Sequence, residues 1–193
     1  MPDALPRDFY ARPTLTVARA LLGTVLCHRR GGDVLRARIV EVEAYIGERD
    51  GACHARAGRT GRTAVMYGPP GHAYVYLVYG MHEMLNVVTE TEGRPAAVLV
   101  RGAERLAGGA LPGPGRLTRA LGIDRALDAA DLCGQRLWIE AGGLARGERI
   151  ARSPRIGIDY AGAPWVDKPW RLFVEGSAGV SRTPRATGTR PRG

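Results

Sequence analysis

Lysine is almost missing from this chain: of its 28 basic residues only Lys168 is a lysine, and the others are arginines. A reaction that needs an amine nucleophile therefore has two candidates, the Lys168 side chain and the N-terminal amine. The arginines suit phosphate recognition through their planar donor groups. A genome biased toward arginine codons explains them more simply, and composition alone favours this explanation.

Cysteine is also scarce, and no disulfide framework is expected. The three cysteines are odd in number, far apart and not in a CxxC pair: Cys27, Cys53 and Cys133. This usage is typical of a reducing compartment, so we expect a cytoplasmic protein. His28, His72 and His82 lack metal-ligand spacing to one another and to the cysteines, and we expect no metal site.

Long hydrophobic runs are missing too, and charge of one sign dominates. No stretch approaches the roughly 20 apolar residues of a membrane span, so we expect no membrane partner. The net charge is +9, which attracts any polyanion and favours nucleic acid only weakly. Residues 182–193 hold four arginines and no acid, and so supply +4 of that charge. We expect a single domain over 1–181, followed over 182–193 by a basic, disordered tail that makes a non-specific electrostatic contact.

Hydrophobic periodicity predicts an α+β fold. Residues 13–22 repeat at helical spacing with Thr14 as a candidate cap, whereas residues 36–45 alternate as a strand does. The aromatic, β-branched run 73–79 and the apolar run that ends at Val88 flank Gly80, a pattern that predicts a projecting hairpin. We also expect a helix after the Gly/Pro-rich loop 106–115, and short strands at 24–28, 96–101, 155–159 and 172–174. Together these elements predict one domain with a curved, largely antiparallel sheet, flanking helices and a protruding β-hairpin.

The strand at 36–45 carries an E-x-E-x-Y pattern. Period two puts Glu41, Glu43 and Tyr45 on one face. Paired carboxylates are a common acid/base arrangement, but an ordinary solvated strand face explains the pattern as well. Spacing alone does not separate Glu41 from Glu43.

Tyrosines and one histidine are further candidates. Tyr74 and Tyr76 share a face and Tyr79 lies on the other, where flat rings beside arginines suit base stacking. Tyrosine is also simply a good strand former. His54 precedes the basic loop 55–63, and a lone histidine is more often a packing or surface residue than a catalyst.

In order along the chain, these stretches resemble the alkyladenine (3-methyladenine) DNA glycosylase family. The resemblance covers about Asp8 to Ser181, and its ordered combination is specific although each part is modest. The matching segments are RIVEVEAYIG at 38–47, His54, PPGHAYVYLVYGMHEMLNVV at 69–88, AVLVRGAE at 97–104, GPGRLTRALGID at 113–124, RIGIDYAG at 155–162 and KPWRLFVEGSAGVS ending at Ser181.

The resemblance implies a role for each matching residue. Glu43, directly before Ala44 and Tyr45, matches the general base, and Arg101 matches the partner that holds the attacking water with it. The carbonyl of Ile156 is expected to help position that water. Other matches line the pocket of the extruded base: Tyr45, His54, Tyr76 and Asn86, of which Asn86 crowds out the 2-amino group of guanine. Matches at the DNA wedge are Tyr79, Met81 and His82, where the family pattern leads us to expect an aromatic in place of His82.

The implied activity is a monofunctional hydrolase of base excision repair. It would flip a damaged purine out of double-stranded DNA and cleave its N-glycosidic bond, leaving an abasic site. The expected lesions are 3-methyladenine, 7-methylguanine, hypoxanthine and ethenoadenine, without a cofactor and with the protein as a monomer. Two other interpretations stay open: a nucleic-acid binding module without catalysis, and a carboxylate-based hydrolase of small glycosides.

Overall fold

A computed structural model describes residues 3–181, and the expected tail at 182–193 lies outside the described residues. One antiparallel sheet dominates this part of the chain, with strands in the order β3-β4-β5-β2-β1-β7; β6 pairs with β5, and β9 joins β2 to β8. The strands are β1 (Val25–Arg30), β2 (Asp33–Ile46), β3 (Ala73–Val78), β4 (His82–Val88), β5 (Ala96–Arg105), β6 (Ala110–Pro112), β7 (Leu137–Glu140), β8 (Ile150–Ser153) and β9 (Arg171–Val174). The curled sheet confirms the expected α+β domain.

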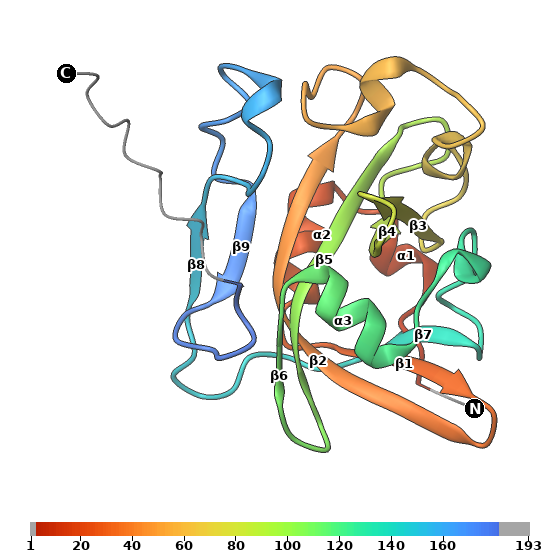
Figure 1. Ribbon diagram of the computed structural model, residues 1–193, viewed down its shortest axis with the longest axis vertical. Coiled ribbons are helices and arrows are strands. Elements are labelled where there is room, and N and C mark those ends of the chain that lie inside the picture. The colour runs from red at the N-terminus through yellow and green to blue at the C-terminus, as the bar shows by residue number, and fades with distance from the viewer. Residues whose placement is uncertain (1–2, 182–193) are drawn as a thin grey trace.

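Short helices flank the sheet (Figure 1). The α-helices are α1 (Arg7–Tyr10), α2 (Thr14–Leu21) and α3 (Pro114–Leu121); the 3-10 helices are η1 (His54–Ala57), η2 (Ala64–Tyr67), η3 (Arg125–Leu127) and η4 (Asp159–Ala161). In the view of Figure 1, α3 lies in front of β5 and α2 behind it. Within the described residues, no helix is long and apolar enough to cross a membrane.

Local sequence explains where the two longer helices begin and end. Pro114 at the start of α3 needs no backbone donor, and Gly122 adopts the left-handed conformation that ends this helix. Thr14 does not cap α2 as expected, because it is already the first helical residue. The cap comes from the distant Glu90, whose carboxylate accepts hydrogen bonds from the backbone N–H and the hydroxyl of Thr14.

The long strands β2 and β5 form the centre of the sheet and pack into the main core. Their pairing is interrupted: Ile39 lies opposite Ala103, Glu41 opposite Gly102 and Val42 opposite Val100. Val40 and Arg101 therefore have no partner across this pair. Such bulges bend strands and redirect side chains, and the strict alternation predicted for 36–45 is wrong here, since Ile39 and its neighbour Val40 both join the core.

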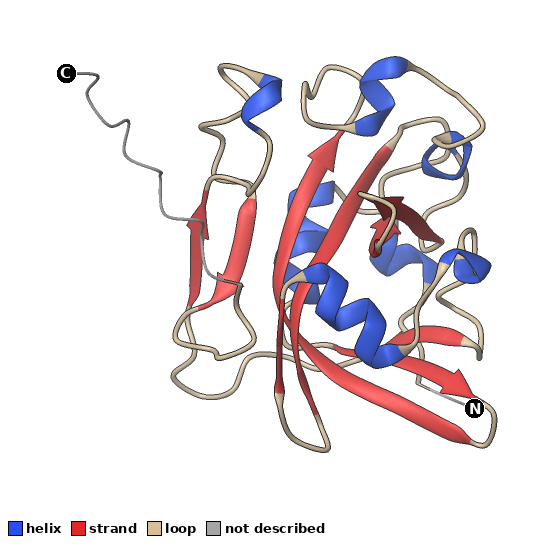
Figure 2. Cartoon of the chain, viewed as in Figure 1, coloured by secondary structure: helices blue, strands red, loops and turns tan. Residues whose placement is uncertain are grey.

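Two loops meet at one end of the sheet (Figure 2). One follows β2 and carries His54, and the other joins β8 to β9. The strand predicted at 155–159 is wrong: β8 ends at Ser153, and the following residues form a loop that ends in η4. Hydrogen bonds of this loop go to the end of β2 and to Asp50, instead of into a strand ladder.

Candidate active site

Both carboxylates of β2 are buried. Glu41 and Glu43 have no exposed surface, so the solvated-face interpretation of the E-x-E-x-Y pattern is wrong. Each carboxylate is instead satisfied by donors from the protein, as buried charges require. The prediction that they share a face with Tyr45 is confirmed: the Tyr45 hydroxyl donates a hydrogen bond to Glu43 at 2.8 Å.

Arg101 links the two carboxylates from the neighbouring strand. Its Nε donates to Glu41 at 3.2 Å and one terminal nitrogen donates to Glu43 at 3.3 Å. The bulge in β5 lets one arginine reach both. Burial lowers the pKa of Arg101, but the negative charges of Glu43 and Glu41 outweigh this effect, so the pKa of Arg101 is raised above its usual value. Arg101 is therefore a fixed cation beside Glu43.

Glu43 accepts three hydrogen bonds in all. Oε2 receives the Tyr45 hydroxyl and Arg101, and Oε1 receives the backbone N–H of Ile156 at 2.8 Å. Burial and then the charge of Glu43 raise the pKa of Tyr45 well above its usual value, so the phenol keeps its proton. The carboxylate offers about four acceptor positions. Three are occupied, and one position on Oε1 remains.

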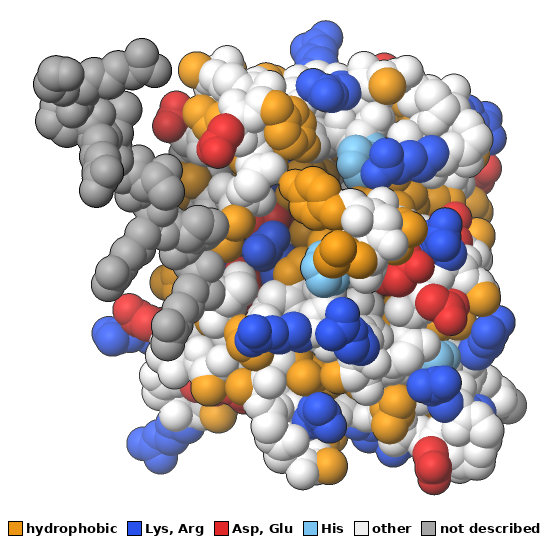
Figure 3. Space-filling model, viewed as in Figure 1, with side chains coloured by type: hydrophobic (Ala, Val, Ile, Leu, Met, Phe, Trp, Pro, Cys, Tyr) orange, Lys and Arg blue, Asp and Glu red, His pale blue; other side chains and the backbone are white. Residues whose placement is uncertain are grey.

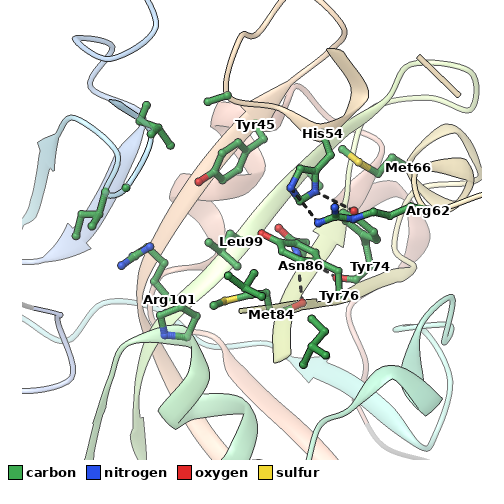
Figure 4. A pocket seen from close by; sticks show the side chains of 18 of the residues that line it. Tyr45, His54, Arg62, Met66, Tyr74, Tyr76, Met84, Asn86, Leu99 and Arg101 are labelled. Carbon is green, nitrogen blue, oxygen red and sulfur yellow. Dashed lines mark hydrogen bonds between the residues drawn. The ribbon is translucent and has the colours of Figure 1, made fainter. Parts of the chain in front are cut away.

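The residues that hold Glu43 also line a pocket of about 670 Å³ (Figure 4). Every residue expected around the base or the water lines it: Tyr45, His54, Tyr76, Asn86, Arg101 and Ile156. Glu43 itself is not in the lining and lies behind Tyr45, Arg101 and Ile156. Asn86 is buried and donates its side-chain amide to the carbonyl of Tyr74 at 3.1 Å, which fixes its direction.

His54 forms an aromatic corner with Tyr74 and Tyr76. Its ring centroid lies 4.6 Å from that of Tyr76 in an edge-on arrangement. Arg62 can only donate, so His54 Nε2 accepts from Arg62 at 3.2 Å, and Nδ1–H donates to the Tyr74 hydroxyl at 2.9 Å. Burial, together with the charges of Arg62 and Arg56, lowers the pKa of His54 to about 4. At neutral pH the ring is uncharged.

The hairpin of β3 and β4 presents Tyr79 at its tip. This side chain is 88% exposed, and its backbone has a positive φ of 52°, a conformation that costs a non-glycine residue of the order of 1–3 kcal/mol. Met81 beside it is 66% exposed, whereas His82 begins β4 and lies against Gly115. In Figure 3, basic side chains lie above and below a central group of hydrophobic side chains on this face.

Sequence reasoning missed an ion pair that holds the pocket together. Arg155 donates to both carboxylate oxygens of Asp50, at 2.6 and 2.9 Å, and neither side chain is exposed. Asp50 also accepts from the backbone of Ile46 and Ala52, in the loop that leads to His54. The Arg155 guanidinium lies 4.8 Å from the centre of the Tyr45 ring. No spacing rule could reveal this pair, because 105 residues separate its members.

Arg62 is a further pocket residue that the sequence did not predict, whereas Tyr74, a stacking candidate without an assigned role, also lines the pocket. The guanidinium of Arg62 lies 5.0 Å from the centre of the Tyr76 ring. The only sequence signal was its position in the basic loop 55–63. Among residues 3–181, no group of three or more His, Cys, Asp and Glu side chains could hold a metal ion.

Comparison with known proteins identifies the family of this chain. The family model for methylpurine-DNA glycosylase matches residues 8–178. A protein of Anaeromyxobacter dehalogenans (strain 2CP-C) is 55% identical over 181 residues, covering 92% of this chain and 86% of that protein. One of Myxococcus xanthus is 52% identical, covering 93% and 94%, and one of Methanocella arvoryzae is 48% identical, covering 92% and 96%. The names of all three assign them as 3-methyladenine DNA glycosylases. The chain thus belongs to the methylpurine-DNA glycosylase family, and it is a monofunctional hydrolase of base excision repair that removes alkylated purines from DNA.

Proposed function

We propose that this protein flips a damaged purine out of double-stranded DNA and hydrolyses its N-glycosidic bond with Glu43 as the general base, leaving an abasic site. The proposed substrates are 3-methyladenine, 7-methylguanine, hypoxanthine and ethenoadenine. The observation that carries the proposal is the Glu43 carboxylate, which is held by three donors directly behind the wall of an aromatic pocket.

The free acceptor position on Glu43 Oε1 fits the attacking water. Since Tyr45, Arg101 and Ile156 occupy the other three positions, a water bonded to Oε1 would have a defined direction. It would lose its proton to the carboxylate as it attacks the sugar carbon. The bond between this carbon and the purine nitrogen breaks at the same time, and the purine takes the bonding electrons, so that a purine methylated at N3 or N7 leaves as a neutral base. The oxocarbenium character that develops on the deoxyribose is also stabilised by the negative charge. The carbonyl of Ile156 would help to position the water, as the resemblance implies, while its N–H holds Glu43.

The pocket suits a flat, electron-poor ring. Tyr45, Tyr76 and His54 present aromatic surface from three directions (Figure 4). A purine methylated at N3 or N7 carries a positive charge, and stacking on aromatic faces contributes about 0.5–2 kcal/mol of cation–π attraction. Because His54 is uncharged at neutral pH, it does not repel that cation. Asn86 would exclude the 2-amino group of normal guanine.

Tyr79 would fill the space that the flipped nucleotide leaves. It projects from the hairpin tip, and its side chain also lines the mouth of the pocket. Stacking in the duplex would offset part of the few kcal/mol that flipping costs. Met81 would lie beside it, while a DNA contact of His82 stays open. The pocket, the proposed general base Glu43 and the wedge residue Tyr79 all belong to one chain, which supports action as a monomer.

The pocket lining contains no lysine. Lys168 instead lies with its amine 5.0 Å from the ring centres of both Trp165 and Trp170. Formation of a Schiff base with the sugar needs an amine within reach. A hydrolytic mechanism without a covalent intermediate agrees with this arrangement.

The proposal is tested by single-turnover excision from duplex oligonucleotides in EDTA, each with one of the four lesions. Wild type should release free base and leave an alkali-labile site. Glu43→Gln should bind the same DNA but lose at least about a hundredfold in rate. The exposed Glu92→Gln is the matched control and should keep the wild-type rate. Normal excision by Glu43→Gln would contradict the mechanism, and binding without excision by wild type would favour a binding module.

A further inference from the structure

The second carboxylate of β2, Glu41, takes no direct part in the proposed hydrolysis. Glu41 is fully buried and accepts four hydrogen bonds shorter than 3.3 Å. Oε1 receives the Nε atoms of Arg101 at 3.2 Å and of Arg171 at 2.6 Å, and the Ser181 hydroxyl at 2.7 Å. Oε2 receives the backbone N–H of Ser181 at 2.6 Å. Packing alone does not require this hub of four hydrogen bonds around Glu41, because burying a charge costs free energy.

Arg101 connects this hub to the catalytic carboxylate. Its Nε faces Glu41, one terminal nitrogen faces Glu43, and the other lies 3.4 Å from the Ser181 hydroxyl. The guanidinium is planar, so fixing its Nε side fixes its other donors. Glu41 and Ser181 thereby limit Arg101 to one hydrogen bond with Glu43.

The charges of the cluster balance. Arg101 and Arg171 face Glu41 and Glu43, and the nearby Arg155 has its own partner in Asp50. Without the charge of Glu41, Glu43 alone would have to balance two buried guanidinium groups. Arg101 would then be free to turn a second donor toward Glu43, where the one remaining acceptor position lies.

We propose that Glu41 is the positioning residue of the catalytic base: it holds Arg101 so that Glu43 keeps an acceptor position for water and the strength of a base. This inference rests on the proposed role of Glu43. It explains why two carboxylates, and not one, share the buried face of β2. Glu41 itself touches no substrate and acts only through Arg101.

The test is the pH dependence of the single-turnover rate on duplex DNA, with thermal unfolding and DNA affinity measured in parallel. Glu41→Gln removes the charge at nearly constant shape. We expect its plateau rate to fall about tenfold and the acid limb of its profile to move to lower pH, because Glu43 then faces excess positive charge. Affinity for DNA should not change. Glu41→Asp keeps the charge and should leave the acid limb at its wild-type position.

A packing defect gives a different result. Val174→Ala creates a cavity in the core on β9, the strand that also carries Arg171, without touching a charge, and should lower the melting temperature while the pH profile stays the same. If Glu41→Gln lowers stability but keeps the wild-type plateau and acid limb, the inference is wrong.

If Glu41→Gln does not fold, Ser181→Ala must lower the plateau about threefold or more, and a wild-type plateau overturns the inference. Glu43→Gln in the same series separates the two proposals, since its full activity would refute the proposed function itself.

Discussion

The backbone N–H of Ile156 donates a 2.8 Å hydrogen bond to the Glu43 carboxylate, although 113 residues separate the two positions in the chain. The neighbouring Arg155 is anchored to Asp50 and to the carbonyl of Ala44. One buried ion pair thus fixes the loop that completes the surroundings of Glu43.

Asp50→Asn should both destabilise the protein and slow excision. It leaves Arg155 as a buried, unpaired charge, which costs about 3–5 kcal/mol and lowers the melting temperature by roughly 6–20 °C in a domain of this size. The Ile156 amide also loses its support, so the single-turnover rate should fall even well below the melting temperature. Thermal unfolding and excision assays check this. A variant that unfolds earlier but excises at the wild-type rate would show that the ion pair is purely structural.

Tyr79→Ala should weaken excision without destabilising the fold. The side chain is 88% exposed, so its removal costs the folded state little, whereas stacking in DNA is worth about 1–3 kcal/mol. We expect a loss of roughly five- to a hundredfold in excision efficiency from duplex DNA and an unchanged melting temperature. Leu106→Ala removes another exposed apolar side chain, 57% exposed on the loop between β5 and β6, and serves as the control. Equal losses in both variants would count against a wedge.

His54 should titrate near pH 4, as followed by the ring resonances of isotope-labelled protein. Burial and the neighbouring charges of Arg62 and Arg56 place the folded pKa below the value of about 6.5 in the unfolded chain. Between pH 6.5 and 4 the unfolded state therefore binds the proton first, and this contribution to stability is lost as the pH falls. Compared with His54→Gln, wild type should lose stability across that window. A titration midpoint near 6.5 would refute the assignment of a neutral His54.

Asn86→Ser should relax the selection against guanine. Asn86 is buried in the pocket lining with its amide tied to the carbonyl of Tyr74, and the shorter serine leaves room for a 2-amino group. Release of guanine from undamaged duplex DNA should rise relative to release of hypoxanthine. Base release measured by chromatography gives this ratio. An unchanged ratio would show that another residue excludes guanine.

Local sequence determined the parts of this protein that depend on near neighbours. Alternation put Glu41, Glu43 and Tyr45 on one face, because strand geometry has a period of two. The aromatic run 73–79 and the apolar run that ends at Val88, on either side of Gly80, predicted the hairpin that carries Tyr79. The ordered motifs predicted the family and, through that resemblance, the pocket residues that the structure brings together.

Tertiary structure alone decided through which contacts the surrounding groups hold Glu43. The bulge that lets Arg101 reach Glu41 and Glu43 arises from the register between two strands, which period-two reasoning cannot see. The same reasoning wrongly assigned a strand at 155–159, where the backbone hydrogen bonds to Glu43 in place of a ladder partner. Asp50 and Arg155 meet only because two distant loops converge at one end of the sheet. Contacts of this kind depend on the packing of the whole chain, so no local pattern records them.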